Sequence, residues 1–180
     1  GAKTPINYLS FLHLSVAQGK VRLHTVEDFV THGVELNSQY HSKNIMSYNF
    51  EVDGLIYDIR YFLSSENTLV AKIKVENRKL RKKRFTLHAT NIYGYPETRW
   101  WGSDGVTAAN NAEIDLGVSK IWAYGDVFTL GSDEPASAFK ATADEVEWNS
   151  WISDNDLTSN DGASVRMPGP LYAVKTYDVE

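Results

Sequence analysis

The sequence contains no cysteine, and only five prolines and twelve glycines among its 180 residues. Without cysteine the chain forms no disulfide, no thiolate metal site and no cysteine nucleophile. The low content of proline and glycine excludes collagen-like and low-complexity classes of protein. No apolar run approaches the roughly 20 residues that a membrane-spanning helix needs, so we expect no membrane partner. The composition that remains, with 42% hydrophobic and 23% charged residues, is that of an ordinary folded protein.

An excess of positive charge is also missing. The formal net charge is −5 and the isoelectric point is near 5.5, which predicts no nucleic-acid partner. The exception is residues 78–84, where six of seven positions are Lys or Arg. Because this run lies between two strand-like segments, it predicts a solvated turn, with phosphate binding or nuclear targeting as the alternative. The Gly1-Ala2-Lys3 start is compatible with a cleaved end, so cytoplasmic location and export after signal removal both stay open.

Alternating apolar residues dominate the middle of the chain. They predict four consecutive antiparallel strands, over residues 45–52, 55–62, 69–75 and 85–90. Asp53-Gly54 lies between the first two and is a strong two-residue hairpin signal, since both positions tolerate a positive φ. Turns every eight to twelve residues are typical of one face of a β-sandwich.

The flanking regions predict further strands and two short helices. Strands are predicted over residues 120–124, 126–130, 137–141 and 171–177, the first two joined at Gly125, whereas residues 11–16 fit a strand or one helical turn. Thr25 predicts a capped helix over about residues 26–32. A capping box of Thr142 and Glu145 predicts a second helix, whose apolar face carries Trp148, Trp151 and Ile152. The predicted fold is a mostly β, antiparallel β-sandwich with one or two short helices, in a single domain over residues 1–180.

One strand pair resembles a unit of a known family. Residues 69–78 alternate and end in Asn77-Arg78, a charged turn follows, and residues 84–90 alternate again. This resembles the large β-sandwich that precedes the (α/α)₆ barrel in several glycosidases and phosphorylases, of the galactose-mutarotase-like supersandwich type. The later order is also similar, with a strand at 138–141, a helix, and then Gly169-Pro170 before a closing strand. The resemblance covers about residues 45–180, although such sandwiches are usually longer than this chain.

The resemblance implies a role in carbohydrate metabolism without catalysis by this chain. The catalytic carboxylates of those enzymes lie on the barrel, which these residues do not include. Residues 1–180 would be a fragment or the N-terminal domain of a longer, glycoside hydrolase-like enzyme. The implied partners are carbohydrate and a following α-helical barrel domain.

The most unusual stretch is residues 91–105, which holds four aromatic residues, an arginine, two acids and three glycines. A loop that only connects strands has about two to five residues, so this one needs a further reason. Aromatic faces stack on sugar rings, and Asp, Asn and Arg hydrogen-bond to hydroxyl groups. The candidate ligand-binding residues are therefore Tyr93, Tyr95, Arg99, Trp100, Trp101 and Asp104. The alternatives are that Trp100 and Trp101 anchor the loop to the core, or that the loop contacts a neighbouring domain.

The sequence lacks motifs for catalysis, metal binding or cofactor binding. We therefore expect no catalytic residue, no bound metal and no cofactor in this chain. The sequence has no HExxH, G-x-S-x-G, G-x-G-x-x-G or P-loop motif. Residues 154–162 begin like a calcium loop, but Ser159 and Val165 replace the glycine and the bidentate glutamate, which favours an Asx-rich turn. His88 on a strand could be the general acid of an epimerase-like enzyme, or simply a histidine with satisfied hydrogen bonds.

Three functions follow, in order of preference. The first is a non-catalytic β-sandwich domain of a carbohydrate-active enzyme, which packs on a catalytic barrel and lends a loop to the sugar site. The second is a free-standing carbohydrate-binding module, and the third is a small aldose-epimerase-like enzyme. A large exposed apolar patch would favour the first, a lone exposed aromatic surface the second, and a deep pocket with His88 beside a carboxylate the third.

Overall fold

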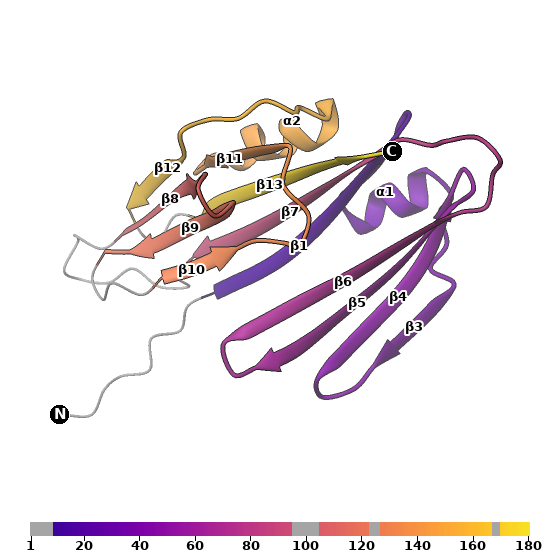
Figure 1. Cartoon of the computed structure of the whole chain (residues 1–180), viewed down its shortest axis with the longest axis horizontal. Coiled ribbons are helices and arrows are strands. Elements are labelled where there is room, and N and C mark those ends of the chain that lie inside the picture. The colour runs from indigo at the N-terminus through magenta and orange to yellow at the C-terminus, as the bar shows by residue number, and fades with distance from the viewer. Residues whose placement is uncertain (1–8, 95–104, 123–126, 167–169) are drawn as a thin grey trace. The chain divides into compact units, whose positions relative to one another are not determined.

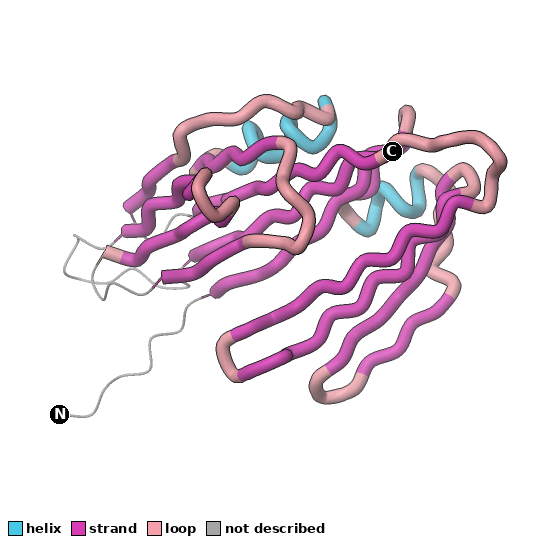
Figure 2. Tube along the Cα trace, in the orientation of Figure 1, coloured by secondary structure: helices cyan, strands magenta, loops and turns pink. Residues whose placement is uncertain are grey.

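The computed structural model describes residues 9–94, 105–122, 127–166 and 170–180, and these are mostly β-structure (Figures 1 and 2). The described residues form three antiparallel sheets and two helices, which confirms the predicted mostly β, antiparallel class. The chain divides into two compact units. The first contains Gly1–Ala17 and Thr86–Val179, and the second contains Gln18–Phe85 with Glu180. That all 180 residues act as one domain stays a prediction.

The first unit contains a smaller sheet and most of a larger one, whose edge strand β2 belongs to the second unit. The strands of the larger one have the order β11-β13-β7-β1-β2, and those of the smaller one β10-β9-β8-β12. The bounds of the larger sheet are β1 (Leu9–Gln18), β2 (Val21–Leu23), β7 (Phe85–Gly94), β11 (Ala138–Thr142) and β13 (Leu171–Val179). Those of the smaller sheet are β8 (Gly105–Asn111), β9 (Leu116–Ile121), β10 (Val127–Leu130) and β12 (Ala163–Arg166). The unit boundary runs through β1 and β7, between residues 17 and 18 and between 85 and 86.

Alternate side chains of the two sheets share one apolar core. Leu171 and Ala173 of β13 belong to the same buried cluster as Val106 and Ala108 of β8 and Ile121 of β9. Since successive residues of a strand point to opposite faces, this cluster is the interior between two sheets of a β-sandwich. The first unit is therefore consistent with the predicted β-sandwich class. The prediction that residues 85–90 follow residues 45–75 as the fourth strand of one sheet is wrong, because β7 pairs with β1 in a different sheet.

The opposite face of the larger sheet is covered by helix α2 (Glu145–Asp154). Trp148, Trp151 and Ile152 of the helix are buried against Tyr172 and Val174 of β13, which confirms the predicted apolar face. Figure 1 shows the helix lying above this sheet.

The predicted cap of α2 is wrong. Asp144, and not Thr142, is the N-cap, and its carboxylate accepts hydrogen bonds from the backbone of Val146 and Glu147. Thr142 is the last residue of β11, and its hydroxyl donates to the Glu147 carboxylate. The extended backbone of β11 continues up to this residue, so the helix begins two positions later than the box requires.

The second unit is built on one four-stranded sheet with the order β3-β4-β5-β6. Its strands are β3 (Ser38–His41), β4 (Ile45–Val52), β5 (Leu55–Ser65) and β6 (Thr68–Asn77). The hairpin between β4 and β5 turns at Asp53 and Gly54, whose φ values of 43° and 83° confirm the predicted two-residue turn. Helix α1 (Val26–Thr31) begins at Thr25, which forms a capping box with Asp28.

Aromatic side chains form the core of the second unit. Phe50 of β4 stacks on Tyr57 of β5 with 4.9 Å between ring centroids, and Phe29 of α1 meets Phe50 edge-on. The Tyr57 hydroxyl is buried and donates to the side chain of Gln18, whose amide donates to the Val52 carbonyl. Burial raises the pKa of this phenol above its ordinary value.

Candidate functional site

Of the six predicted ligand-binding residues, only Tyr93 lies among the residues that the structure describes. Tyr93, near the end of β7, is only 3% exposed and belongs to the sandwich core. Its hydroxyl accepts a hydrogen bond from the Asn91 amide, and burial raises its pKa to about 12. We therefore assign Tyr93 to the core and leave it out of the binding surface. Tyr95, Arg99, Trp100, Trp101 and Asp104 lie outside the described residues, so their role stays a prediction.

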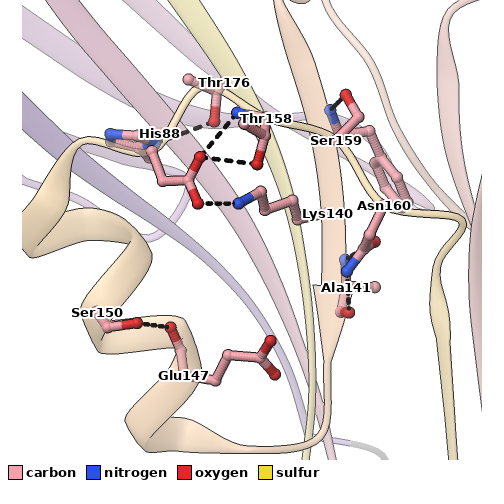
Figure 3. A network of polar contacts seen from close by, with 11 residues as sticks. His88, Lys140, Ala141, Glu147, Ser150, Thr158, Ser159, Asn160 and Thr176 are labelled. Carbon is pink, nitrogen blue, oxygen red and sulfur yellow. Dashed lines mark hydrogen bonds and ion pairs between the residues drawn. The ribbon is translucent and has the colours of Figure 1, made fainter.

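His88, the candidate general acid, is buried in a polar network between β7, β13 and the end of α2 (Figure 3). Its Nδ1 lies 3.0 Å from the hydroxyl of Thr176, and its Nε2 lies 3.1 Å from the side-chain oxygen of Asn155. Asn155 is the C-cap of α2 with a positive φ, and its amide donates to Thr86. A general acid must reach its substrate, whereas both nitrogens of this ring bond to groups that fasten the helix to the sheet. The geometry favours the interpretation of His88 as a histidine with satisfied hydrogen bonds.

A partly buried ion pair joins strand β11 to the segment after α2. The ammonium group of Lys140, which Figure 3 labels, forms an ion pair with the carboxylate of Asp156. The same ammonium group lies 4.9 Å from the ring centroid of Trp151. The same carboxylate accepts hydrogen bonds from the backbone and the hydroxyl of Thr158. The hydrogen bond from Lys140 is the largest cause that lowers the pKa of Asp156, to about 2.

The remaining polar side chains of this segment cover the edge of β11. Asn160 accepts from the backbone amide of Ala141 and donates to its carbonyl, at 2.9 and 3.0 Å, and Ser159 accepts from the amide of Phe139 (Figure 3). An exposed edge strand invites pairing with other chains, so these bonds protect the sheet. Asp156, Ser159 and Asn160 thus serve structure, which favours the Asx-rich turn over the calcium loop. The described residues contain no group of three His, Asp or Glu that could hold a metal ion.

A second buried lysine lies in the larger sheet. Lys175 of β13 is fully buried, and its ammonium group binds both the carboxylate and the backbone carbonyl of Asp115, in the turn between β8 and β9. Asp115 has a positive φ and also accepts from the backbone of Ala136. The hydrogen bond from Lys175 lowers the pKa of Asp115. The ion pair between Lys175 and Asp115 holds the turn between β8 and β9, in which Asp115 has a positive φ. Both charged groups are bound within the protein, so this geometry does not suggest a catalytic site.

The basic run 78–84 connects β6 to β7 and lies in a surface loop, as predicted. Lys83 pairs with Asp53, and Arg78 lies 3.6 Å from Glu76. The Asn77 side chain accepts a hydrogen bond from the backbone amide of Lys79 and donates one to the backbone carbonyl of Arg81. Hydrogen bonds within the loop therefore hold this turn. These contacts favour a solvated turn.

Exposed apolar side chains gather at one end of the second unit. In register, Met46 of β4 is opposite Tyr61 of β5, and Leu63 of β5 is opposite Leu69 of β6. Together with Lys43, these residues line an open hollow of about 290 Å³. Ile45, Met46, Leu63 and Leu69 are between 43% and 55% exposed. We call this surface the apolar end of the β3–β6 sheet.

A second exposed surface is the outer face of the smaller sheet in the first unit. Trp122 follows β9, is 42% exposed, and donates from its indole nitrogen to the hydroxyl of Thr107 at 2.8 Å. Its backbone amide binds the Gly105 carbonyl. A Cβ on Gly105 would lie 2.7 Å from the six-membered ring of Trp122, so the indole rests on this glycine. One tryptophan face is thereby fixed against the sheet.

Sequence reasoning identified neither surface. Trp122 was placed inside a predicted strand, where alternation alone does not show which face is covered. The glycine beneath it is 17 positions away in the sequence and is brought opposite by the pairing of β8 with β9. Met46 and Leu69 continue the alternation of apolar residues on their strands, so the sequence pattern carries no signal that their side chains are exposed.

No described helix is long and apolar enough to cross a membrane. Comparison with known proteins does not assign this chain to a family, because no protein-family model and no curated protein matches it. What the protein does must therefore be inferred from the surfaces and networks described above.

Proposed function

We propose that this chain is a non-catalytic β-sandwich domain of a carbohydrate-active, glycoside hydrolase-like enzyme, and that it packs on a catalytic α-helical barrel. The observation that carries the proposal is the apolar end of the β3–β6 sheet, where Met46, Leu63 and Leu69 are exposed on one face and Ile45, on the other face, lines the same hollow. Contiguous exposed apolar surface on a soluble domain typically marks a site of protein contact. A partner domain that covers it would remove these side chains from water.

The contacts of the candidate catalytic side chains support the non-catalytic part of the proposal. Glycoside hydrolysis uses two carboxylates about 5–10 Å apart in an accessible site. Asp156 and Asp115, the carboxylates beside the buried lysines, are each bound by an ammonium group and a backbone amide. His88 is held by Thr176 and Asn155 in the interior. These groups hold elements together and are placed poorly for reaction with a sugar.

The loop contribution is part of the same proposal. Tyr95, Arg99, Trp100, Trp101 and Asp104 would form the edge that this domain lends to the sugar site of the barrel. Their composition supports it, because aromatic and arginine side chains commonly dominate contact surfaces.

The docking part is tested in the protein that carries this chain together with its barrel. Leu63→Ser with Leu69→Ser should lower the melting temperature and expose the junction to limited proteolysis, because the covered apolar surface becomes polar. The matched control is Val26→Ser with Val30→Ser, two exposed residues of α1 outside this surface. If both double variants melt and are cleaved like the wild type, or if the full reading frame encodes no barrel, the proposal is wrong.

The catalytic part is tested on the chain alone. The purified 180-residue protein should hydrolyse no aryl glycoside and interconvert no aldose anomers above the buffer rate. Saturable turnover that one carboxylate substitution or His88→Ala abolishes would contradict the proposal. The free-standing module is the second candidate, and the observation that favours it is the exposed Trp122.

A further inference from the structure

We propose that strand β6 binds an extended acidic peptide segment as an additional antiparallel strand of the β3–β6 sheet. The backbone of β6 is the template, and Lys72 and Lys74 bind the carboxylates of the added segment. This inference goes beyond the proposed function, because neither a barrel nor a sugar takes part. The site lies in the second unit, and all of its residues are described.

The first observation is an open sheet edge. Strand β6 is the last in the order β3-β4-β5-β6, and among the described strands it pairs with β5 alone (Figure 1). Its ten residues contain no proline or glycine, and its register with β5 is unbroken from Leu69 to Asn77. Such an edge presents a row of unpaired amides and carbonyls, which is the template that the addition of a β-strand uses.

The second observation concerns the backbone groups that face outward. In an antiparallel ladder, residues that hydrogen-bond to the partner strand alternate with residues whose amide and carbonyl point away. The amide of Arg78 donates to the carbonyl of Gly54, one rung beyond the register of β5 with β6. Counting back from this bond in steps of two, the even-numbered residues of β6 bond to β5. Ala71, Ile73 and Val75 therefore turn their amides and carbonyls away from β5.

The third observation is the alternation of side chains on β6. Lys72 and Lys74 are exposed on one face, whereas Ile73 and Val75 on the opposite face are half-buried. Ile59, which lies opposite Ile73 on β5, is fully buried. The apolar face is thus covered at β5 but partly in water at β6. An added strand with apolar residues at every second position would bury more of Ile73 and Val75.

The fourth observation is charge. Residues 18–85 contain 12 Lys and Arg but only 8 Asp and Glu, a net charge of +4 in a chain whose total is −5. Arg60 lies opposite Lys72 on β5 but is paired with Asp58 at 3.0 Å. Among the described residues, no ion pair or hydrogen bond engages the side chains of Lys72 and Lys74. Two residues of a strand span about 6.7 Å, so carboxylates at alternate positions of an extended segment match the spacing of these lysines.

These observations select the occupant of the edge. An antiparallel pair of two β6 strands centred on Lys72, Ile73 or Lys74 would set lysine opposite lysine, which disfavours a second copy of this chain. A polyanion such as heparin would use the lysines but would leave the outward backbone groups and the apolar side chains without partners. An extended segment that alternates acidic and apolar residues matches the backbone groups, the apolar side chains and the charge together.

The experiment uses the purified chain and a fluorescent octapeptide of alternating valine and glutamate with blocked ends. Fluorescence anisotropy at low salt should show saturable binding, and a peptide of alternating valine and lysine should bind at least tenfold more weakly. In antiparallel pairing, the valine amides would face β6 and the glutamate amides would face away. N-methylation of the valines should therefore weaken binding at least tenfold, whereas N-methylation of the glutamates should change it less than twofold.

A matched pair of double variants tests the charge of the protein. Lys72→Gln with Lys74→Gln should weaken binding of the valine–glutamate peptide at least fivefold, with an unchanged melting temperature. Lys20→Gln with Lys43→Gln removes the same charge from two exposed turns of the same unit, and should leave binding within twofold of the wild type.

Four results would overturn the proposal. They are no saturable binding of the valine–glutamate peptide, equal binding of the two N-methylated peptides, equal effects of the two double variants, and binding of heparin as tight as that of the peptide. The last result would assign the surface to a polyanion. None of these variants changes Leu63 or Leu69, so the outcome is independent of the docking proposal.

Discussion

The two compact units differ in how much of the apolar surface of their sheets they bury. In the first unit, the strands β11, β13 and β7 are covered on one face by the smaller sheet and on the other by α2, and even the ammonium groups of Lys140 and Lys175 are buried beside carboxylates. In the second unit, the β3–β6 sheet buries Phe50 and Tyr57 at one end but exposes apolar residues at the other. The described strands β11, β13 and β7 of the first unit are thus covered within that unit, whereas the second unit leaves apolar residues of its sheet exposed.

The difference shows in the aromatic residues of β4 and β5. Phe50 and Tyr57 are stacked and buried, and Tyr48 continues the stack toward Tyr61, which is half-buried. Exposure therefore increases along the same face of the same strands, while the alternation of apolar residues does not change. A pattern of this kind predicts which side of a strand is apolar, but not how much of that side the protein covers by itself.

The largest expected effect is in the first unit. Trp151→Ala should lower the free energy of unfolding by about 3–5 kcal/mol, because it leaves a cavity under α2 and removes the ring beside Lys140. Val146→Ala on the exposed side of the same helix should change it by less than about 0.5 kcal/mol. Urea unfolding followed by tryptophan fluorescence measures this unit, since all five tryptophans belong to it. Equal effects of the two substitutions would show that α2 is not part of the core.

Strand β5 allows the same comparison within the second unit. Ile59 is buried and Leu63, four residues further along the strand, is exposed. Ile59→Ala should cost about 2–4 kcal/mol, and Leu63→Ala less than about 0.5 kcal/mol in the chain alone. Unfolding followed by circular dichroism measures both. A large loss for Leu63→Ala would mean that this chain already covers the apolar end, and the comparison between the units would fail.

The start of α2 gives a smaller effect. Asp144→Ala should cost about 1 kcal/mol, because two backbone amides lose their acceptor. Glu145→Gln, at the position that the sequence pattern assigned to the capping box, should cost only a few tenths of a kcal/mol from the helix dipole. Chemical denaturation measures the loss of stability in both variants. A larger loss for Glu145→Gln than for Asp144→Ala would support the capping box that the sequence predicts.

Local signals carried most of the correct fold predictions. The hairpin at Asp53-Gly54 and the cap at Thr25 depend on the backbone preferences of a few adjacent residues, and both are confirmed. Strands β8 and β12 were missed, because Gly105–Asn111 and Ala163–Arg166 are short and rich in small or polar residues. Their pairing with each other, which defines them, joins residues more than 50 positions apart.

The candidate site could be predicted less well than the fold. The pairing of Lys140 with Asp156 and the support of Trp122 by Gly105 both arise from tertiary contacts, and no short spacing encodes them. Tyr93 looked like part of a binding loop, because its sequence neighbours are aromatic and polar. Strand β7 extends four residues beyond the predicted end at residue 90, and this extension places the ring in the core.

The smallest expected effect is a dependence on pH of the ion pair between Lys140 and Asp156. The pKa of this carboxyl is lowered from 3.8 to about 2 in the folded chain, so its ionised form stabilises the fold. That contribution is complete above the pKa of the unfolded chain, near 4, and is lost as the pH falls through about 2. The full shift corresponds to roughly 2 kcal/mol, but the carboxylate side chain is 32% exposed, so screening by solvent should reduce the pH-dependent part to under about 1 kcal/mol.

Asp156→Asn isolates this contribution, since the amide keeps the shape of the side chain and removes its charge. The free energy of unfolding of the wild type should exceed that of the variant by a larger margin at pH 6 than at pH 2, because acid protonates the wild-type carboxyl and makes the two proteins alike. Asp161→Asn, which removes an exposed carboxylate from the same loop, is the control for the general effect of acid. If the margin for Asp156→Asn is the same at both pH values, the carboxylate does not stabilise the first unit through its charge, and only its hydrogen bonds to Thr158 hold the segment beside β11.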